Sequence, residues 1–290
     1  MENQQYQDYN EPLRVQLENL PIDAPEFSPN NPPWNSLMAF LMWVASILFI
    51  LIIPTIGIII YVMVKGADLT DSNKLSESIQ SDPNAILVNI ICVIPAHLLT
   101  ILLAWLVVTQ TNKYSFREML GWKWGGFNIL YLVGIVIVFF TFAAILSNFI
   151  PEKDNDLLKI LRSSRTSVYF VAFMATFTAP LVEEVVYRGI MYSAFQRTLG
   201  ISGAVTLVTL LFALVHVPQY YPSYSTIIMI CLLSLVLTLV RVKSKNLLPC
   251  IILHTMFNGI QSIFLIAEPY LKQLSPEQPH VGTVILQLFK

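Results

Sequence analysis

The stretch LMAFLMWVASILFILIIPTIGIIIYVMV, residues 37–64, contains no Asp, Glu, Lys or Arg. It is longer than the roughly 20 apolar residues that a helix needs to cross the hydrocarbon core of a bilayer. Similar runs recur along the whole chain. The seven predicted spans are Leu37–Val64, Ala85–Thr109, Phe127–Ile150, Ser167–Tyr192, Ser202–Val217, Thr226–Val240 and Leu247–Ile266. The sequence therefore predicts an all-α fold, a polytopic transmembrane helix bundle of about seven spans.

The composition supports a membrane protein. Of the 290 residues, 55% are hydrophobic and only 12% are charged, whereas a soluble domain carries about 25% charged residues. The net charge of −1 gives no basic excess that would bind nucleic acid. The spacing of the three cysteines, Cys92, Cys231 and Cys250, fits neither a disulfide framework nor a zinc finger. We expect a multi-pass integral protein of the cell membrane, with the lipid bilayer as a partner and no nucleic acid.

The polar residues divide the chain into four parts. Residues 1–36 are acidic and proline-containing, which predicts a disordered N-terminal tail. Residues 37–150 form three accessory transmembrane helices with one histidine, His97, for which we expect a helix-to-helix hydrogen bond. Residues 167–266 contain nearly all the intramembrane polar groups, and residues 267–290 form a polar C-terminal tail.

Residues 179–189, APLVEEVVYRG, place three charges in an apolar helix. Each charge at the centre of a bilayer helix costs about 2.5–3.5 kcal/mol on insertion scales, so these residues must pair or face a cavity. Glu184 and Arg188 are four residues apart with the acid first, the favourable order for a pair on one helix face. Glu183 lies about 100° around the helix from Glu184. The spacing therefore predicts a Glu184–Arg188 pair and leaves Glu183 free for acid–base chemistry.

Two further motifs follow in separate spans. Phe212-Ala-Leu-Val-His216 ends the fifth predicted span, and His254-Thr-Met-Phe-Asn258 lies in the seventh. His254 and Asn258 project from one face because they are four residues apart. The fifth and seventh spans run in the same direction, so three helices can bring an acid, two imidazoles and an amide together. For Phe212 itself we expect a packing role.

Three other interpretations remain open at this stage. An intramembrane acid such as Glu183 would also serve a proton- or ion-coupled transporter, although no internal repeat of the kind common in transporters is present. A non-catalytic membrane scaffold or immunity protein is a second possibility. The Glu184–Arg188 pair and Asn258 each have a purely structural interpretation as well, as an ion pair and as a bond between helices.

The order Glu-Glu-x-x-x-Arg, Phe-x-x-x-His and His-x-x-x-Asn resembles the CPBP intramembrane proteases. That family includes the type II CAAX prenyl proteases and the bacterial Abi and bacteriocin-processing proteins. The resemblance covers about residues 167–266. It implies an intramembrane endopeptidase that hydrolyses peptide bonds of membrane-associated protein substrates or lipidated peptides, including CAAX-type prenylated ones.

The resemblance also implies roles for individual residues. Glu183 and His216 would activate water, His254 and Asn258 would stabilise the oxyanion, and Glu184 with Arg188 would brace the site. The zinc signature His-Glu-x-x-His is absent. Glu183, His216 and His254 are candidate ligands for a three-ligand zinc site. If His254 serves the oxyanion, only one histidine remains for a metal. We therefore favour a mechanism without a cofactor, while a divalent metal such as zinc stays an alternative.

Overall fold

The computed structural model describes residues 27–66, 79, 82–150, 153 and 164–274, and in these ranges it is helical with no β-strand. The two π-helical segments, Met174–Thr178 and Val185–Met191, flank α9. The α-helices are α2 Ser36–Val64, α4 Pro83–Thr109, α5 Phe116–Leu120, α6 Ile129–Ser147, α8 Arg165–Phe173, α9 Ala179–Glu184, α10 Tyr192–Tyr220, α11 Tyr224–Ser244 and α12 Leu248–Leu274.

Six helical runs within the described residues are long and apolar enough to cross a membrane, judged by length and composition. This confirms the predicted all-α polytopic bundle. The six runs are Ser36–Val64, Pro83–Thr109, Ile129–Ser147, Arg165–Tyr220, Tyr224–Ser244 and Leu248–Glu268.

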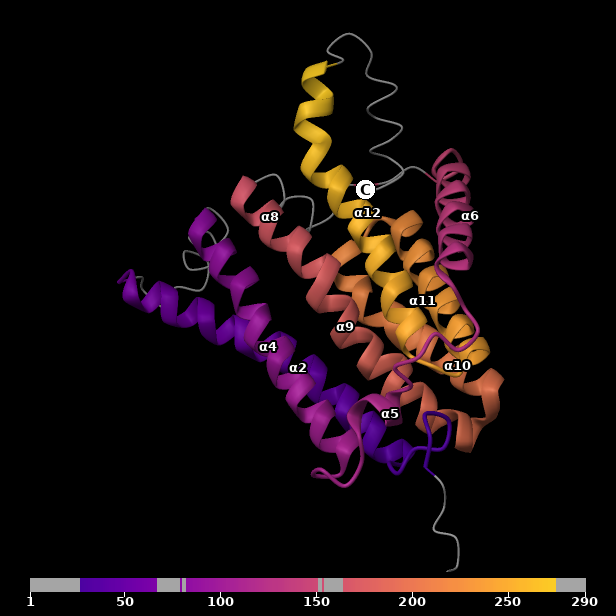
Figure 1. Cartoon of the computed structure of the whole chain (residues 1–290). Helices are drawn as coiled ribbons and strands as arrows, with labels where there is room; N and C mark the ends of the chain where they lie inside the picture. Colours follow the sequence, from indigo (N-terminus) through magenta and orange to yellow (C-terminus); the bar gives the residue numbers. More distant parts are fainter. Residues whose placement is uncertain (1–26, 67–78, 80–81, 151–152, 154–163, 275–290) are drawn as a thin grey trace, which may run out of the picture.

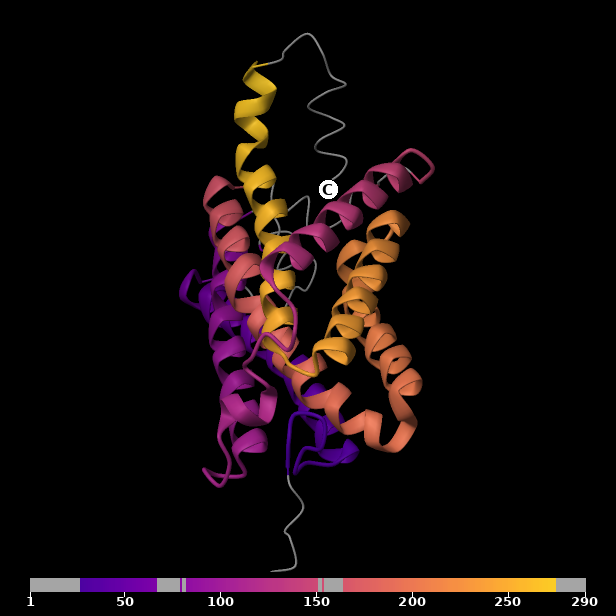
Figure 2. The same cartoon turned by 45° about the vertical axis from the view of Figure 1, so that its right-hand side comes forward.

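The fourth and fifth predicted spans lie in one continuous run, Arg165–Tyr220, which consists of two helices that meet at a kink. The run contains a kink at Gly200, whose φ of 70° and ψ of 174° lie outside the helical region. Such angles are accessible essentially only to glycine. Beyond the kink, α10 turns back to lie beside α11 (Figures 1 and 2).

Polar side chains begin several of the spans by capping the first turn. Asn35, Asp82, Asn128 and Ser164 each accept a hydrogen bond from a backbone N–H of the helix that follows. This satisfies a donor that has no partner within the helix. Each of these helices therefore begins directly after the polar residue that precedes the apolar run in the sequence.

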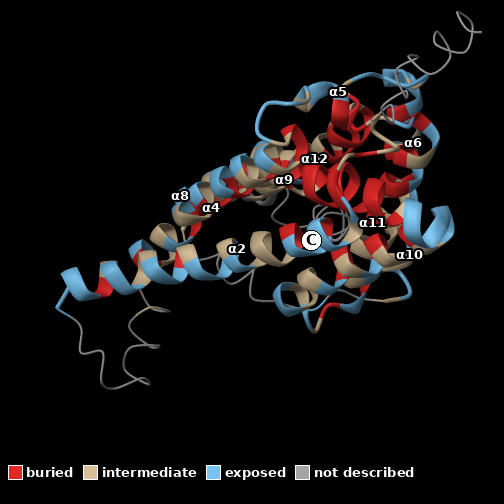
Figure 3. Ribbon diagram, turned by 90° about the horizontal axis from the view of Figure 1, so that it is seen from below, coloured by how far each residue is buried: buried red, intermediate tan, exposed pale blue. Residues whose placement is uncertain are grey.

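The helices pack around the central run that contains α8 and α9. Helices α2 and α4 lie together on one side, and α11 and α12 lie with α6 on the other (Figure 1). Buried residues gather where α5, α9, α11 and α12 meet, whereas much of α2 is exposed (Figure 3). One buried cluster joins α2, α4 and α5 to residues 185–195, and a second joins α6, α11 and α12. Val185, Val186 and Tyr187 of the motif segment 179–189 belong to the first cluster.

The segment before α2 packs against the bundle. Trp34 is 1% exposed, and its Nε1 donates a hydrogen bond to the carbonyl of Ile190 at 3.0 Å. Residues 27–35 therefore lie against the π-helical segment that follows the two adjacent glutamates. Residues 1–26, the greater part of the predicted disordered tail, lie outside the described residues, and disorder there stays a prediction.

Arg241 of α11 joins this N-terminal segment to the motif helix. Its guanidinium is buried and donates to the carbonyl of Arg188 at 3.2 Å, to Asn30 Oδ1 at 2.8 Å and to the carbonyl of Pro29 at 2.7 Å. Neutral oxygens thus satisfy a buried cation, which would otherwise be costly. Arg241 therefore links residues 29–30 to the backbone of Arg188.

Candidate active site

The two adjacent glutamates lie in a helix of unusual geometry. Residues Met174–Thr178 and Val185–Met191 are π-helical, and the α-helical Ala179–Glu184 lies between them. π-helical turns are rare and frequently lie at functional sites. The widened turns change which face each side chain occupies on either side of Glu183 and Glu184. Both acids therefore lie in a short α-helical segment with an interruption of the helix on each side.

Glu184 and Arg188 form a fully buried pair, with 2.8 Å between Oε1 and Nη1. The remaining Arg188 donors bind α11, where Nη2 donates to the carbonyl and the hydroxyl of Ser234 at 2.9 and 2.7 Å, and Nε donates to Thr238 Oγ1 at 3.3 Å. Further hydrogen bonds of this kind lower the cost of burying the Arg188 charge, whereas Glu184 Oε2 has no hydrogen-bond partner among the described residues. The sequence analysis did not include Ser234 and Thr238, although small hydroxyl residues four apart in an apolar span are a usual sign of helix contact.

His254 lies between the two acids. Its Nδ1 is 2.8 Å from Glu184 Oε1, and its Nε2 is 3.8 Å from Glu183 Oε2. The Glu183 side chain is 25% exposed, whereas that of Glu184 is fully buried. One acid is therefore embedded in the bundle, the other is accessible, and one imidazole faces both.

His216 is oriented by its own helix. Its Nδ1 is 2.7 Å from the carbonyl oxygen of Phe212. A carbonyl only accepts, so Nδ1 donates and, in the neutral imidazole, Nε2 carries the lone pair. This leaves Nε2 as the proton acceptor.

Phe212 contributes more than the packing expected of it. Its ring centroid lies 4.6 Å from that of His216 and 6.1 Å from that of His254. The guanidinium of Arg188 lies over the same ring, 4.7 Å from the centroid. The phenyl ring therefore contacts both imidazoles and supports the buried cation.

Asn258 lies one turn beyond His254 on α12. Its Nδ2 donates to the carbonyl of Ala175 at 2.8 Å, within the first π-helical segment. A primary amide has two N–H donors. The bond to Ala175 fixes the amide and uses one of them.

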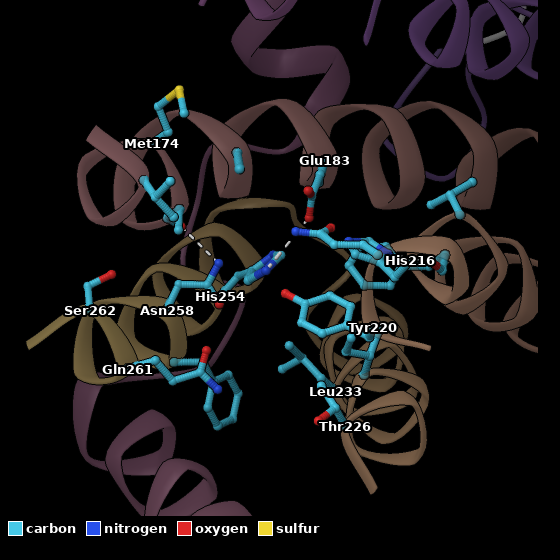
Figure 4. A pocket seen from close by; sticks show the side chains of 18 of the residues that line it. Met174, Glu183, His216, Tyr220, Thr226, Leu233, His254, Asn258, Gln261 and Ser262 are labelled. Atoms are coloured by element: carbon cyan, nitrogen blue, oxygen red, sulfur yellow. Dashed lines mark hydrogen bonds and ion pairs between the residues drawn. The ribbon is translucent and has the colours of Figure 1, made fainter. Parts of the chain in front are cut away.

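A cavity of about 660 Å³ brings the motif residues into one space. Glu183, His216, His254 and Asn258 all line it, and Figure 4 shows the first three around the same part of the cavity. Glu183, Glu184, Arg188 and His254 are also in direct contact or ion-pair range. His216 and Asn258 share the cavity with Glu183 and His254, but their hydrogen bonds are to Phe212 and Ala175.

His97 of α4 lines the same cavity from the accessory helices. Its Nδ1 lies 3.0 Å from Thr178 Oγ1 in the first π-helical segment. The expected helix-to-helix hydrogen bond is therefore confirmed. His97 also belongs to the surroundings of Glu183, which the sequence analysis did not anticipate.

The candidate metal ligands are not arranged as a three-ligand site. Across the described ranges, no group of three or more His, Cys, Asp or Glu side chains lies close enough to hold one metal ion. Both ring nitrogens of His254 face carboxylates, and Nδ1 is within hydrogen-bonding distance of Glu184. The set Glu183, His216 and His254 therefore does not fit the three-ligand geometry of a catalytic zinc site.

Comparison with known proteins identifies one family. Residues 165–260 match the model of the family described as type II CAAX prenyl endopeptidase Rce1-like. The match begins with α8, ends within α12, and includes every motif position. No curated protein and no solved structure matches the chain. The family match confirms the resemblance inferred from the three motifs, and this multi-pass integral membrane protein carries, over about a third of its length, a segment similar to the Rce1-like type II CAAX prenyl endopeptidases.

Proposed function

We propose that this protein is an intramembrane endopeptidase that hydrolyses peptide bonds of membrane-associated protein substrates, including CAAX-type prenylated ones. The observation that carries the proposal is the position of His254. It faces the cavity between a buried acid, Glu184, and an accessible acid, Glu183. One acid fixes the imidazole, and the other is left to act on a substrate.

Glu183 and His216 activate the attacking water in this mechanism. The lone pair on His216 Nε2 accepts one water proton as a hydrogen bond, and the Glu183 carboxylate removes the other proton. The resulting hydroxide attacks the peptide carbonyl carbon and forms a tetrahedral intermediate. Glu183 then returns the proton to the leaving amine nitrogen as the C–N bond breaks.

His254 and Asn258 stabilise the oxyanion of that intermediate. With its Nδ1–H donating to Glu184, a doubly protonated His254 offers Nε2–H to the oxyanion. Asn258 offers the amide N–H that Ala175 does not use. Donors fixed in advance in a dry site are the most effective form of this stabilisation. The buried Glu184–Arg188 pair keeps His254 in place.

A cleavage assay with the purified protein tests the proposal. The protein in lipid nanodiscs is mixed with a farnesylated CAAX-type peptide and with a transmembrane peptide of about 20 apolar residues. New termini are read by mass spectrometry. We expect the native protein and Glu118→Gln, a change at an exposed position of α5 outside the cavity, to cut at least one peptide. Glu183→Gln should cut neither.

Two results would contradict the proposal. Cleavage that persists in Glu183→Gln would remove Glu183 from the reaction. A folded native protein that cuts no peptide, yet moves protons or ions across vesicles in a manner that depends on Glu183, would favour the transporter.

A further inference from the structure

One imidazole in the cavity takes no part in the proposed mechanism. His97 of α4 lines the cavity and is 7% exposed. Helix α4 passes beside α9, which carries Glu183 (Figure 1), and Glu183 is near enough for its charge to act on the His97 ring. The accessory helices therefore bring a third histidine to the reacting groups, from outside the segment that matches the family.

The ring of His97 is held in one orientation through Nδ1. Thr178 Oγ1 lies 3.0 Å from Nδ1 and donates its own hydrogen to the carbonyl of Met174 at 3.4 Å. Because that hydrogen is used, Oγ1 accepts a hydrogen bond from His97 Nδ1–H. No carboxylate of a described residue lies within ion-pair distance of this ring, in contrast with the ring of His254. We therefore assign His97 as a neutral imidazole, in which Nε2 carries the lone pair.

The lone pair on His97 Nε2 faces open space. Within the part of the chain that the structure describes, no residue forms a hydrogen bond with Nε2. The enclosed side-chain atoms without a partner there are Ser167 Oγ, Glu184 Oε2 and Thr209 Oγ1. Nε2 is not one of them, so it opens onto the cavity as an unused, uncharged acceptor.

The proposed mechanism leaves one group of the scissile peptide without a partner. His254 and Asn258 donate to its carbonyl oxygen, and Glu183 and His216 accept from the attacking water. The peptide N–H still needs an acceptor in a dry space. When water adds to the carbonyl carbon, the nitrogen keeps this hydrogen and its lone pair becomes localised. That lone pair must face the proton on Glu183 before the C–N bond can break.

We propose that His97 is a substrate-positioning residue whose Nε2 accepts a hydrogen bond from the scissile N–H. With the N–H directed at His97, the nitrogen lone pair of the tetrahedral intermediate faces Glu183. His97 neither gains nor loses a proton, because the hydrogen stays on the leaving amine, whose second hydrogen comes from the water through Glu183. Resting on the proposed protease function, this inference gives α4 a part in the active site. It also restricts the cut to bonds that carry an N–H, which a bond before proline lacks.

An ester at the cut bond tests the inference. The peptide that is cut in the nanodisc assay is remade with an ester oxygen in place of the scissile N–H, and full-length native protein and His97→Asn are compared on both substrates. The asparagine amide can still donate to Thr178 but has no atom at the position of Nε2. We expect His97→Asn to cut the peptide at least about tenfold more slowly, since an N–H is left unpaired in a dry site. It should cut the ester at the native rate.

Two further variants act as controls. Thr100→Val changes another α4 side chain of the same cavity, one whose hydroxyl donates to the carbonyl of Ala96 in its own helix. It should leave both rates unchanged. His97→Gln can place an amide oxygen near the position of Nε2, so it should retain more peptide cleavage than His97→Asn. Thermal unfolding checks that each variant is folded.

Two results would overturn the inference. An equal loss of peptide and ester cleavage in His97→Asn would assign His97 a structural role, and unchanged peptide cleavage would show that the scissile N–H has another acceptor. In both cases Glu183-dependent cleavage by the native protein leaves the protease proposal standing. A folded native protein that cuts no peptide in the nanodisc assay would instead reject the protease proposal, and this inference with it.

Discussion

A single carboxylate oxygen, Oε1 of Glu184, is where the first and third motifs meet. It lies 2.8 Å from Arg188 Nη1 and 2.8 Å from His254 Nδ1, and all three side chains are buried. Removing either partner leaves the buried Glu184 carboxylate with one fewer hydrogen-bond donor. Leaving a buried charge without its partner lowers stability by more than the pair adds to it. Removing one partner should therefore have a measurable effect on stability.

Replacing Arg188 with alanine should therefore lower stability before it affects chemistry. We expect Arg188→Ala to lose about 3–5 kcal/mol, because the change leaves a buried Glu184 carboxylate without its cation. Unfolding in detergent, followed by tryptophan fluorescence, measures the loss. The double variant Glu184→Gln/Arg188→Ala should recover part of it. Arg188→Ala protein that is inactive but as stable as the native protein would contradict the bracing role.

Replacing Asn258 should lower the turnover number and leave folding unchanged. Asn258→Ala removes one proposed oxyanion donor, which lowers kcat by about 10²–10³-fold in other acyl-transfer sites. Asn89→Ala is a matched control, since Asn89 is an exposed asparagine of α4 in the same cavity. Turnover and KM for a cleaved peptide are compared across the three proteins. A change confined to KM would assign Asn258 to substrate binding instead.

Among the helices, the fourth membrane run is the one whose shape departs most from a straight span. The kink at Gly200 has a φ of 70°, and α10 turns there so that His216 comes to face the same cavity as Glu183. A backbone conformation of this kind costs other residues about 1–3 kcal/mol. The position of His216 in the cavity therefore depends on a backbone conformation at residue 200 that favours glycine.

Alanine substitution of two glycines tests this coupling. Gly200→Ala should lower the melting temperature and the activity together. Gly134→Ala in α6 should be neutral or slightly stabilising, because Gly134 is helical and a Cβ there meets nothing within 4 Å. Equal melting temperatures for the two variants would show that the kink does not depend on glycine.

The segment before α2 should act as a structural element in its own right. Removing residues 1–26 should leave stability unchanged, because the acidic composition there predicts disorder. Removing residues 27–35 as well should destabilise the protein, since buried Arg241 then loses Asn30 and Pro29 and the indole of Trp34 loses Ile190. Thermal unfolding of the two truncated proteins makes the comparison. Equal stability of the shorter protein would contradict a structural role for residues 27–35.

Local patterns in the sequence predicted the helices and the pair of Glu184 with Arg188, because span length and i,i+4 spacing are properties of one helix. The contacts of Glu184 with His254 and of Arg241 with Pro29 and Asn30 join distant parts of the chain. They depend on how whole helices pack, which no local spacing contains. The break between the fourth and fifth predicted spans contains the kink at Gly200. The sequence did not show that the helix continues up to this residue, since a glycine between two apolar runs is also compatible with a loop.

The whole bundle places an accessible acid, two histidines and an amide in one intramembrane cavity, closed on one side by accessory helices outside the family match. The most direct test of the central claim compares the peptide termini of membrane proteins from cells with the native chain and from cells with Glu183→Gln at equal expression. Proteolysis predicts new termini that appear only with the native chain. Identical termini in both, with the native protein inserted and folded, would contradict it.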